Sequence, residues 1–525
     1  MRITKNFFFS FIFLFVFLTF LKVDFRFTDN IYCCSDDFDY YMHAETISQD
    51  FDFDYSNQLK GLETKRFNKN NKPAPIGYVG TGILAAPFMF IGGMVDKFSS
   101  SSGIMNYKFL IYSIAPIFYL SASYILLIKS LNILNFKFDN LKFLIFFLGS
   151  GVTYYAFERF SMTHSYEFFT TSLLIYSCAK YYKKSNLNNR YAILIPIAIF
   201  FGLATRWTNY FLLIIPIIFK LILKSDKKLI INPYFVLTSV ASLSTFLYLS
   251  YAIYGVISLD PRTSYQVSSS VVEIAQIQVN KNIYIEYFDR IINIFVTKEF
   301  GIIYFMPILS FTVFITIFLI FKNILTKNKF DKAGLYYLIA CFQPLLIVAI
   351  WRSTGSAYGF RYLLTLYPLS IIFYFYLKKH YRLFFIDKVI IIFSILSILS
   401  LLFFETTPDT QLSLERIYNS FGKYTRYTQP NYLLGLFKSF IIFDSYLKIF
   451  TTSFFGAICF KFLIVVFGKN NLIDLLGNFG LPTSNPDFII YLENLELISV
   501  DKFIFLILFG LSIYIYMLKN LVKNN

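Results

Sequence analysis

Uninterrupted apolar runs recur along this chain, and they constrain its fold more than any other feature. The runs are about 16–22 residues long, which is what an α-helix needs to cross ~30 Å of hydrocarbon. Of the 525 residues, 56% are hydrophobic and only 15% are charged. A soluble protein carries about a quarter charged residues, and a membrane barrel shows ~10-residue alternating segments. The chain is therefore predicted to be an all-α polytopic membrane protein.

The apolar runs predict a bundle of about 12 (11–13) transmembrane helices. The first run covers residues 7–21 and the last covers 503–518. Ten further spans are predicted between them, at 109–128, 143–158, 167–182, 191–206, 210–224, 233–256, 301–321, 333–351, 362–377 and 388–404.

Basic residues predict how the spans are oriented in the membrane. The net charge of +17 comes from short clusters between spans, among them 220–228, 322–332 and 378–382. Such clusters are typical of cytoplasmic loops. Because this topology accounts for the positive charge, no nucleic-acid partner is expected. With Arg2 and Lys5 ahead of the first span, the N-terminus is predicted to be cytoplasmic, with that span as an uncleaved anchor. The first exterior loop then covers 24–108.

Two apolar segments fit this topology less simply. Residues 76–95 are uncharged and long enough to cross, but a crossing would place every later basic cluster outside. The segment is also rich in glycine, which disfavours a regular helix. We expect a helix or re-entrant piece in the exterior leaflet that does not cross. The segment 433–467 either crosses once or lies at the interface within an exterior region at 405–500.

The remaining polar residues fall on the exterior side. The acidic pair Asp36 and Asp37 opens the first loop, just past the first span. Ionisable residues at a membrane boundary are costly and often functional, and both signs on one face suit a substrate with a charged head and a lipid tail. The other members of this exterior set are His43, Glu158, Arg159, His164, Arg206, Asp260, Arg262, Lys298, Glu299, Arg352 and Arg361.

Several short motifs, in this order, resemble the GT-C superfamily of polytopic glycosyltransferases, of the protein O-mannosyltransferase and aminoarabinose-transferase kind. The first loop is similar to that family's opening pattern, D-[DE]-x-x-Y-x-x-x-A. The other similar stretches are P-I-G-Y at 75–78 with L-A-A-P-F at 84–88, S-M-T-H-S at 161–165, G-L-A-T-R at 202–206, F-G-I-I-Y-F-M-P at 300–307, and the segment from Trp351 to Tyr362. Together they cover about residues 1–380.

The resemblance implies transfer of a sugar from a polyprenyl-phosphate donor to an acceptor on the non-cytoplasmic face. Asp36 or Asp37 is then the expected catalytic base, which deprotonates an acceptor hydroxyl. Arg361 and Arg206 are expected to bind the donor phosphate, because guanidinium groups grip phosphate with two hydrogen bonds. A divalent metal ion is an open option, with Glu158 and His164 as its ligands. The chain's three histidines are too dispersed for a multi-histidine site.

Each of these residues has a simpler reading. The acidic pair could be an ordinary solvated loop start, His164 a hydrogen-bonded interface residue, and Glu158 the cap of a span. Arg206 beside Trp207 could anchor the interface, and Arg361 could reach toward lipid headgroups.

Residues 1–404 are expected to form a GT-C-like catalytic module, and 405–525 a variable exterior or interfacial region that ends in the last span. The expected partners are a polyprenyl-phosphate-linked sugar, membrane lipids, and an acceptor that is a glycan, a lipid or a protein. The expected place is the bacterial cytoplasmic (inner) membrane, with the active site on its exterior, periplasmic face. Two other classes remain open: a transporter or flippase of lipid-linked sugars, and a non-catalytic membrane assembly factor.

Overall fold

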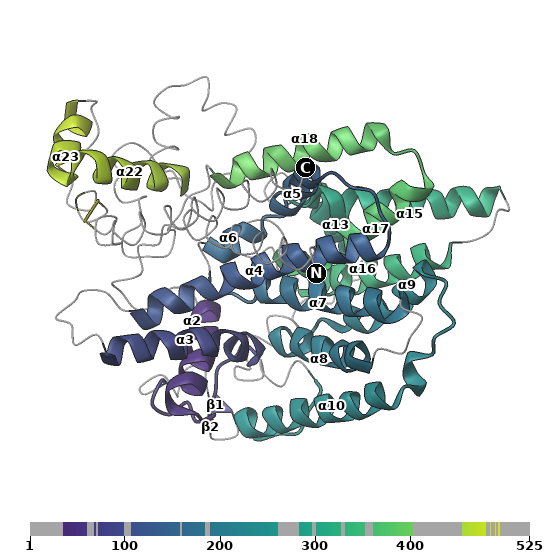
Figure 1. The fold of residues 1–525 in the computed structure, drawn as a ribbon, viewed down its shortest axis with the longest axis horizontal. Coiled ribbons are helices and arrows are strands. Elements are labelled where there is room, and N and C mark those ends of the chain that lie inside the picture. Colours follow the sequence, from purple (N-terminus) through teal and green to yellow (C-terminus); the bar gives the residue numbers. More distant parts are fainter. Residues whose placement is uncertain are drawn as a thin grey trace, which may run out of the picture.

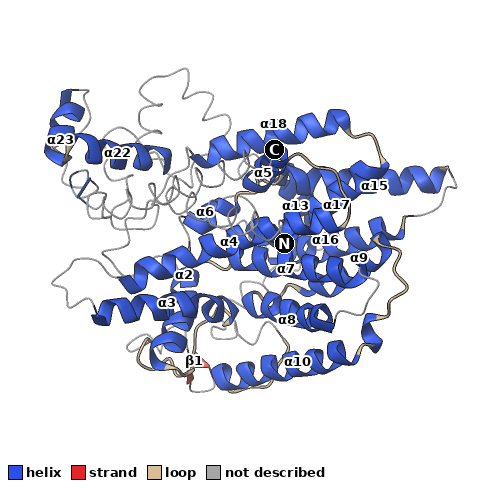
Figure 2. Cartoon of the chain, in the orientation of Figure 1, coloured by secondary structure: helices blue, strands red, loops and turns tan. Residues whose placement is uncertain are grey.

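A computed structural model describes the larger part of the chain, and the described part is helical (Figures 1 and 2). The described residues are 35–59, 68–69, 72–98, 107–157, 160–183, 189–260, 283–296, 301–326, 331–351, 361–402, 454–478, 483–484, 489 and 492–493. In these ranges the only sheet is a two-residue antiparallel pair, β1 (Asn68–Lys69) and β2 (Lys72–Pro73). The first and last predicted spans, 7–21 and 503–518, lie outside the described residues.

The N-terminal half supplies the first group of helices. They are α2 (Ser35–Glu45), η2 (Thr46–Asp50), α3 (Gly80–Phe98), α4 (Tyr107–Ile133), α5 (Asn140–Leu148), α6 (Val152–Phe157), α7 (His164–Lys183), α8 (Asn189–Thr205), η3 (Tyr210–Ile214), α9 (Ile215–Ile222), η4 (Leu229–Ile231) and α10 (Pro233–Tyr254).

The second group follows in the C-terminal half. Its members are α13 (Ile283–Val296), α14 (Ile302–Phe305), α15 (Pro307–Leu325), α16 (Lys332–Trp351), η5 (Arg361–Leu366), α17 (Tyr367–His380), α18 (Phe384–Leu402), α22 (Phe454–Phe467) and α23 (Lys469–Asn478).

Four of the described helices are long and apolar enough to span a membrane: α3, α4, α10 and α15. Their outward faces carry large apolar side chains. On α10, Leu237 is 71% exposed and Val240 is 58% exposed. Such surface is costly in water and suits contact with lipid. The structure thus confirms a helical protein with four helices that could span a membrane, while the count of about 12 spans stays a prediction.

Among the described residues, four predicted spans are interrupted rather than continuous, and each interruption has a local cause. The span at 143–158 divides into α5 and α6, because the chain turns at Gly151 with a φ of 74°, a conformation that glycine adopts readily. The spans at 210–224, 301–321 and 362–377 each contain a proline near the start of the longer helix, at Pro216, Pro307 and Pro368. Proline lacks an N–H and favours the first turn of a new helix.

The glycine-rich segment at 76–95 forms a continuous helix from Gly80, which is the helical one of the two expected alternatives, although its glycines disfavour a helix. Two of those glycines are required by close contacts. A Cβ at Gly80 would lie 2.3 Å from the backbone of Ala204 at the end of α8, and a Cβ at Gly82 would lie 2.3 Å from the Cβ of His43 in α2. In Figure 1, α3 starts at the end of α8 and extends away from it, beside α4. Whether α3 crosses the bilayer stays a prediction.

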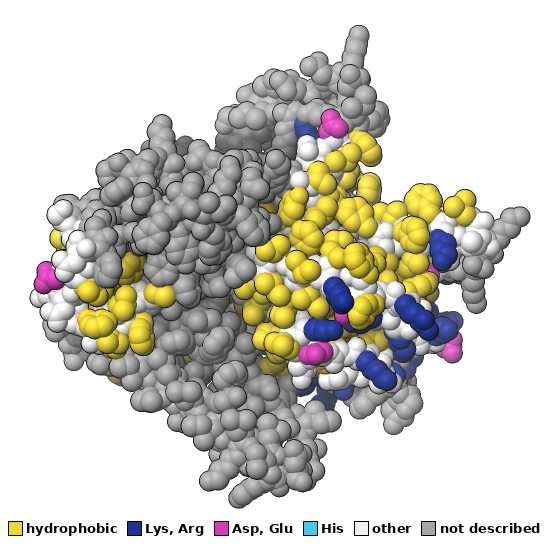
Figure 3. All heavy atoms as spheres, turned by 90° about the horizontal axis from the view of Figure 1, so that it is seen from above, with side chains coloured by type: hydrophobic (Ala, Val, Ile, Leu, Met, Phe, Trp, Pro, Cys, Tyr) yellow, Lys and Arg dark blue, Asp and Glu magenta, His cyan; other side chains and the backbone are white. Residues whose placement is uncertain are grey.

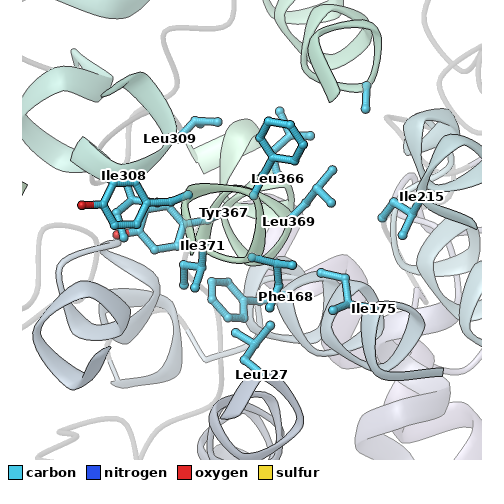
Figure 4. Close-up of a cluster of buried hydrophobic side chains, with 14 of the residues drawn as sticks. Leu127, Phe168, Ile175, Ile215, Ile308, Leu309, Leu366, Tyr367, Leu369 and Ile371 are labelled. Atoms are coloured by element: carbon cyan, nitrogen blue, oxygen red, sulfur yellow. The ribbon is translucent and has the colours of Figure 1, made fainter. Parts of the chain in front are cut away.

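The main core surrounds α7, most of whose residues are buried. Phe168 and Ile175 of α7 pack among side chains from α4, α9, α15, η5 and α17 (Figure 4). The labelled partners are Leu127, Ile215, Ile308, Leu309, Leu366, Tyr367, Leu369 and Ile371. This core fixes the start of α7 next to η5 and the start of α17, where Thr171 and Thr365 share a hydrogen bond of 3.3 Å.

The two ends of α7 have different chemical characters. Its last turn carries Lys180 and Lys183, and Lys227 from the loop after α9 donates to the carbonyl of Tyr181 at 2.7 Å. The parallel helix α17 ends in Lys378, Lys379 and His380. In the coloured part of Figure 3, Lys and Arg side chains gather toward one end, and hydrophobic side chains cover much of the remaining coloured surface. The basic loops therefore lie together, opposite the end where α7 begins.

Candidate functional site at the start of helix α7

The acidic pair lies in the first turn of α2. The side chain of Asp37 is buried, with 1% of its surface exposed. The side chain of Asp36 is outside the described residues. Carboxylates at a helix N-terminus are stabilised by the helix dipole, so their position has a structural benefit as well as the expected catalytic one. A third carboxylate, Asp39, is also buried and accepts a hydrogen bond from the backbone N–H of Gly77 at 3.2 Å.

His43 fastens the first loop to α2. Its Nε2 lies 2.6 Å from the carbonyl oxygen of Gly77, and its Nδ1 lies 2.6 Å from the hydroxyl of Tyr55. A carbonyl only accepts, so Nε2 carries the proton, and Nδ1 then accepts from Tyr55. The ring is completely buried, and burial lowers the pKa of His43 to about 4. Both ring nitrogens are occupied by the protein itself, which identifies His43 as a structural residue.

The same loop leads to α8. Gly80 packs against Ala204 and Thr205, directly before Arg206. Tyr78, two residues earlier, places its ring 4.8 Å from that of Trp207. Trp207 is 4% exposed and its indole N–H donates to the carbonyl of Leu259 at 2.7 Å. The loop before α3 and the end of α8 therefore meet at the end of the bundle where α7 starts.

A buried ionic group occupies the first turn of α7. Glu167 is completely buried, and its two carboxylate oxygens bind different partners. Oε1 accepts from Nε of Arg206 at 2.5 Å, and Oε2 accepts from Nδ1 of His164 at 3.3 Å. Thr163 links this group to α8 by donating to the carbonyl of Thr205 at 3.0 Å. A buried carboxylate needs such partners, because an unpaired charge away from water is costly.

Two guanidinium groups converge on one aromatic ring. The Cζ of Arg206 lies 4.4 Å from the ring centroid of Tyr362, and the Cζ of Arg361 lies 5.0 Å from it. Arg361 also donates from Nη2 to the Tyr362 hydroxyl at 3.0 Å and is 8% exposed. Both distances lie within the range of cation–π attraction. Both guanidinium groups therefore lie near the same ring, and positive charge gathered there favours the binding of an anion.

The structure brings together three of the predicted site residues: His164, Arg206 and Arg361. They come from α7, the end of α8 and the start of η5, which are distant in sequence. The simpler readings of two of these residues do not fit their contacts. Arg206 pairs with Glu167 instead of anchoring an interface, and Arg361 is too buried to reach headgroups. Glu158 lies outside the described residues, as do Arg159, Arg262, Lys298, Glu299 and Arg352.

Glu167 and Tyr362 are site residues that the sequence reasoning missed. Glu167 was placed inside the predicted span at 167–182 and treated as part of it. Its spacing of three from His164 puts both side chains on one helix face. An acidic residue within an apolar span is itself a functional signal. Tyr362 follows Arg361 directly, and its role as the shared platform depends on tertiary packing.

The described residues give little support to a metal centre. Within the described ranges there is no group of three or more His, Cys, Asp or Glu residues that could hold an ion. Of the two expected ligands, only His164 is described. Its Nε2 is one donor, which is fewer than a metal site needs.

Comparisons with known proteins identify no relative: no family model, curated protein or solved structure matches this chain.

Proposed function

We propose that this protein is a GT-C-type membrane glycosyltransferase that moves a sugar from a polyprenyl-phosphate donor to an acceptor. The observation that carries the proposal is the convergence of Arg206 and Arg361 on Tyr362, beside the buried Glu167. This cationic group lies at the end of the bundle opposite the basic loops, which is the exterior side under the positive-inside rule. The proposed place is a bacterial inner membrane, with about 12 spans.

The reaction explains why two guanidinium groups are needed. The acceptor oxygen forms a bond to the anomeric carbon of the sugar while the bond from that carbon to the phosphate oxygen breaks. The leaving polyprenyl phosphate takes the bonding electron pair and gains one negative charge. Positive groups fixed beside that oxygen stabilise the transition state more than the ground state. We assign this role to Arg206 and Arg361.

The proton of the acceptor hydroxyl must go to a base. The carboxylates at the start of α2, Asp36 and Asp37, are the proposed bases, as the family resemblance implies. Their helix is tied to the loop that packs on α8, next to Arg206. A positioned base contributes about 10²–10⁴-fold to the rate.

The test is transfer of labelled sugar from a panel of polyprenyl-phosphate donors by the purified protein in lipid nanodiscs. Arg361→Lys keeps the charge but loses the two-pronged geometry of the guanidinium. We expect it to lower transfer about 100-fold or more. The matched control is Arg382→Lys in the exposed basic loop at the opposite end, which should transfer at the wild-type rate. Wild-type transfer by Arg361→Lys would contradict the assigned site.

A further inference from the structure

The segment from Thr153 to Tyr166 contains an unusual concentration of buried polar atoms without a partner. Among the described residues, five such atoms fall in this segment. They are the hydroxyl oxygens of Thr153, Ser161, Ser165 and Tyr166 and the Nε2 of His164. Native structures have only a few buried unsatisfied groups per hundred residues, and each one calls for water, an ion or a ligand.

Among these five atoms, Nε2 of His164 is the one whose protonation state follows from the contacts of its side chain. Its Nδ1 lies against a carboxylate oxygen of Glu167, which accepts, so Nδ1 carries the proton. His164 is the first residue of α7, ahead of the span predicted at 167–182, and burial lowers its pKa to about 3. The ring is therefore neutral at pH 7, and Nε2 presents a lone pair that accepts a hydrogen bond.

The ring of His164 is held in place on three sides. Glu167 fixes its Nδ1, the ring of Tyr155 packs edge-on with centroids 4.5 Å apart, and the ring of Tyr362 lies 6.3 Å away. Tyr362 is also the platform for Arg206 and Arg361. Nε2 is therefore a buried acceptor without a hydrogen-bond partner among the described residues, on a rigid imidazole beside the proposed phosphate site.

We infer that Nε2 of His164 accepts a hydrogen bond from a hydroxyl of the donor sugar, so that Glu167 organises two adjoining subsites, one for sugar and one for phosphate. This inference rests on the proposed function. In the donor, sugar and phosphate are joined by a single oxygen, so their subsites must be neighbours. Glu167 binds His164 through one oxygen and Arg206 through the other, which gives that adjacency. Aromatic rings beside polar groups also suit a sugar, which has both apolar and hydroxyl faces.

The test compares two ligands on the full-length protein in nanodiscs: a polyprenyl phosphate, and the same carrier bearing each of a panel of hexoses and pentoses. His164→Phe keeps a ring but removes the acceptor. We expect it to weaken binding of the preferred sugar-bearing carrier about tenfold or more, with little change for the bare phosphate. His164→Gln places an amide oxygen near the Nε2 position and should restore part of the loss. His380→Phe, an exposed histidine at the opposite end, is the matched control.

A second measurement changes the sugar and uses only the wild-type protein and His164→Gln. Carriers whose sugar lacks one hydroxyl each are bound to wild-type protein and to His164→Gln. One deoxy sugar should bind about tenfold more weakly to wild type than its parent, and this difference should shrink in His164→Gln. The inference is overturned if His164→Phe and His164→Gln weaken both carriers equally or neither, or if no deoxy sugar is discriminated. If wild type binds neither carrier, the proposed function itself fails, and this result is distinct from the others.

Discussion

Two completely buried histidines, His43 in α2 and His164 in α7, lie in the two parts of the molecule that meet at the proposed site. His43 uses both ring nitrogens for contacts within the protein, to Tyr55 and Gly77. His164 uses one, to Glu167, and its other nitrogen has no partner among the described residues. The imidazole of His43 thus connects two segments of the protein through both nitrogens, whereas the imidazole of His164 has one buried acceptor nitrogen without a partner among the described residues. Both histidines are equally buried, so burial does not distinguish the structural role from the proposed binding role. The number of ring nitrogens with a hydrogen-bond partner does distinguish them.

The largest stability effect is expected from breaking the ionic group at α7. Glu167→Ala leaves Arg206 without its buried carboxylate partner and His164 without an acceptor. Removing one partner of a buried pair costs about 3–5 kcal/mol, which thermal unfolding in detergent would show. The control is Glu493→Ala, whose partner Lys469 is on the surface, where an ion pair contributes about 0–1 kcal/mol. Equal losses in the two variants would show that the group at α7 is not a buried pair.

His43→Ala tests the histidine whose two ring nitrogens both have partners within the protein. The change leaves the Tyr55 hydroxyl without its acceptor, while the Gly77 carbonyl keeps a hydrogen bond of 3.2 Å from Tyr254. One buried group without a partner costs about 1–3 kcal/mol. The folded protein should still show the wild-type ratio of dissociation constants for the bare polyprenyl phosphate and the sugar-bearing carrier. If His43→Ala weakens binding of the sugar-bearing carrier selectively, as His164→Phe is expected to do, the two histidines do not differ in role.

The helical class could be predicted from the sequence, because long apolar runs have few alternatives to a helix in a membrane. The predicted spans at 167–182, 191–206 and 233–256 correspond to α7, α8 and α10 within a few residues. Interruptions such as the one at Gly151 were missed, because they depend on backbone conformation rather than hydropathy. Arg206 and Arg361 could be selected as charges in apolar surroundings. Their shared ring could not, because it comes from packing between α8 and η5.

The smallest expected effect is on the pH dependence of stability. The folded pKa of His43 is about 4, below its ordinary value of 6.5, so the unfolded chain binds more protons between these values. Stability is therefore full above pH 6.5 and falls as pH drops toward 4. In His43→Ala this fall should be shallower by at most about 1.4 kcal/mol per pH unit. Urea unfolding in detergent from pH 7 to pH 4 measures the difference. Identical slopes would mean that His43 is not buried in its neutral form.

The most direct test of the account is sugar transfer by the double variant Asp36→Asn and Asp37→Asn, measured together with donor binding. Asparagine keeps the size and hydrogen bonding of the side chain but removes its basicity. The control is Asp52→Asn, an exposed carboxylate in the same loop. We predict a loss of transfer of about 10²–10⁴-fold in the double variant, with donor binding through Arg206 and Arg361 retained. Full transfer by the double variant would contradict the proposed mechanism and favour the transporter or assembly-factor class.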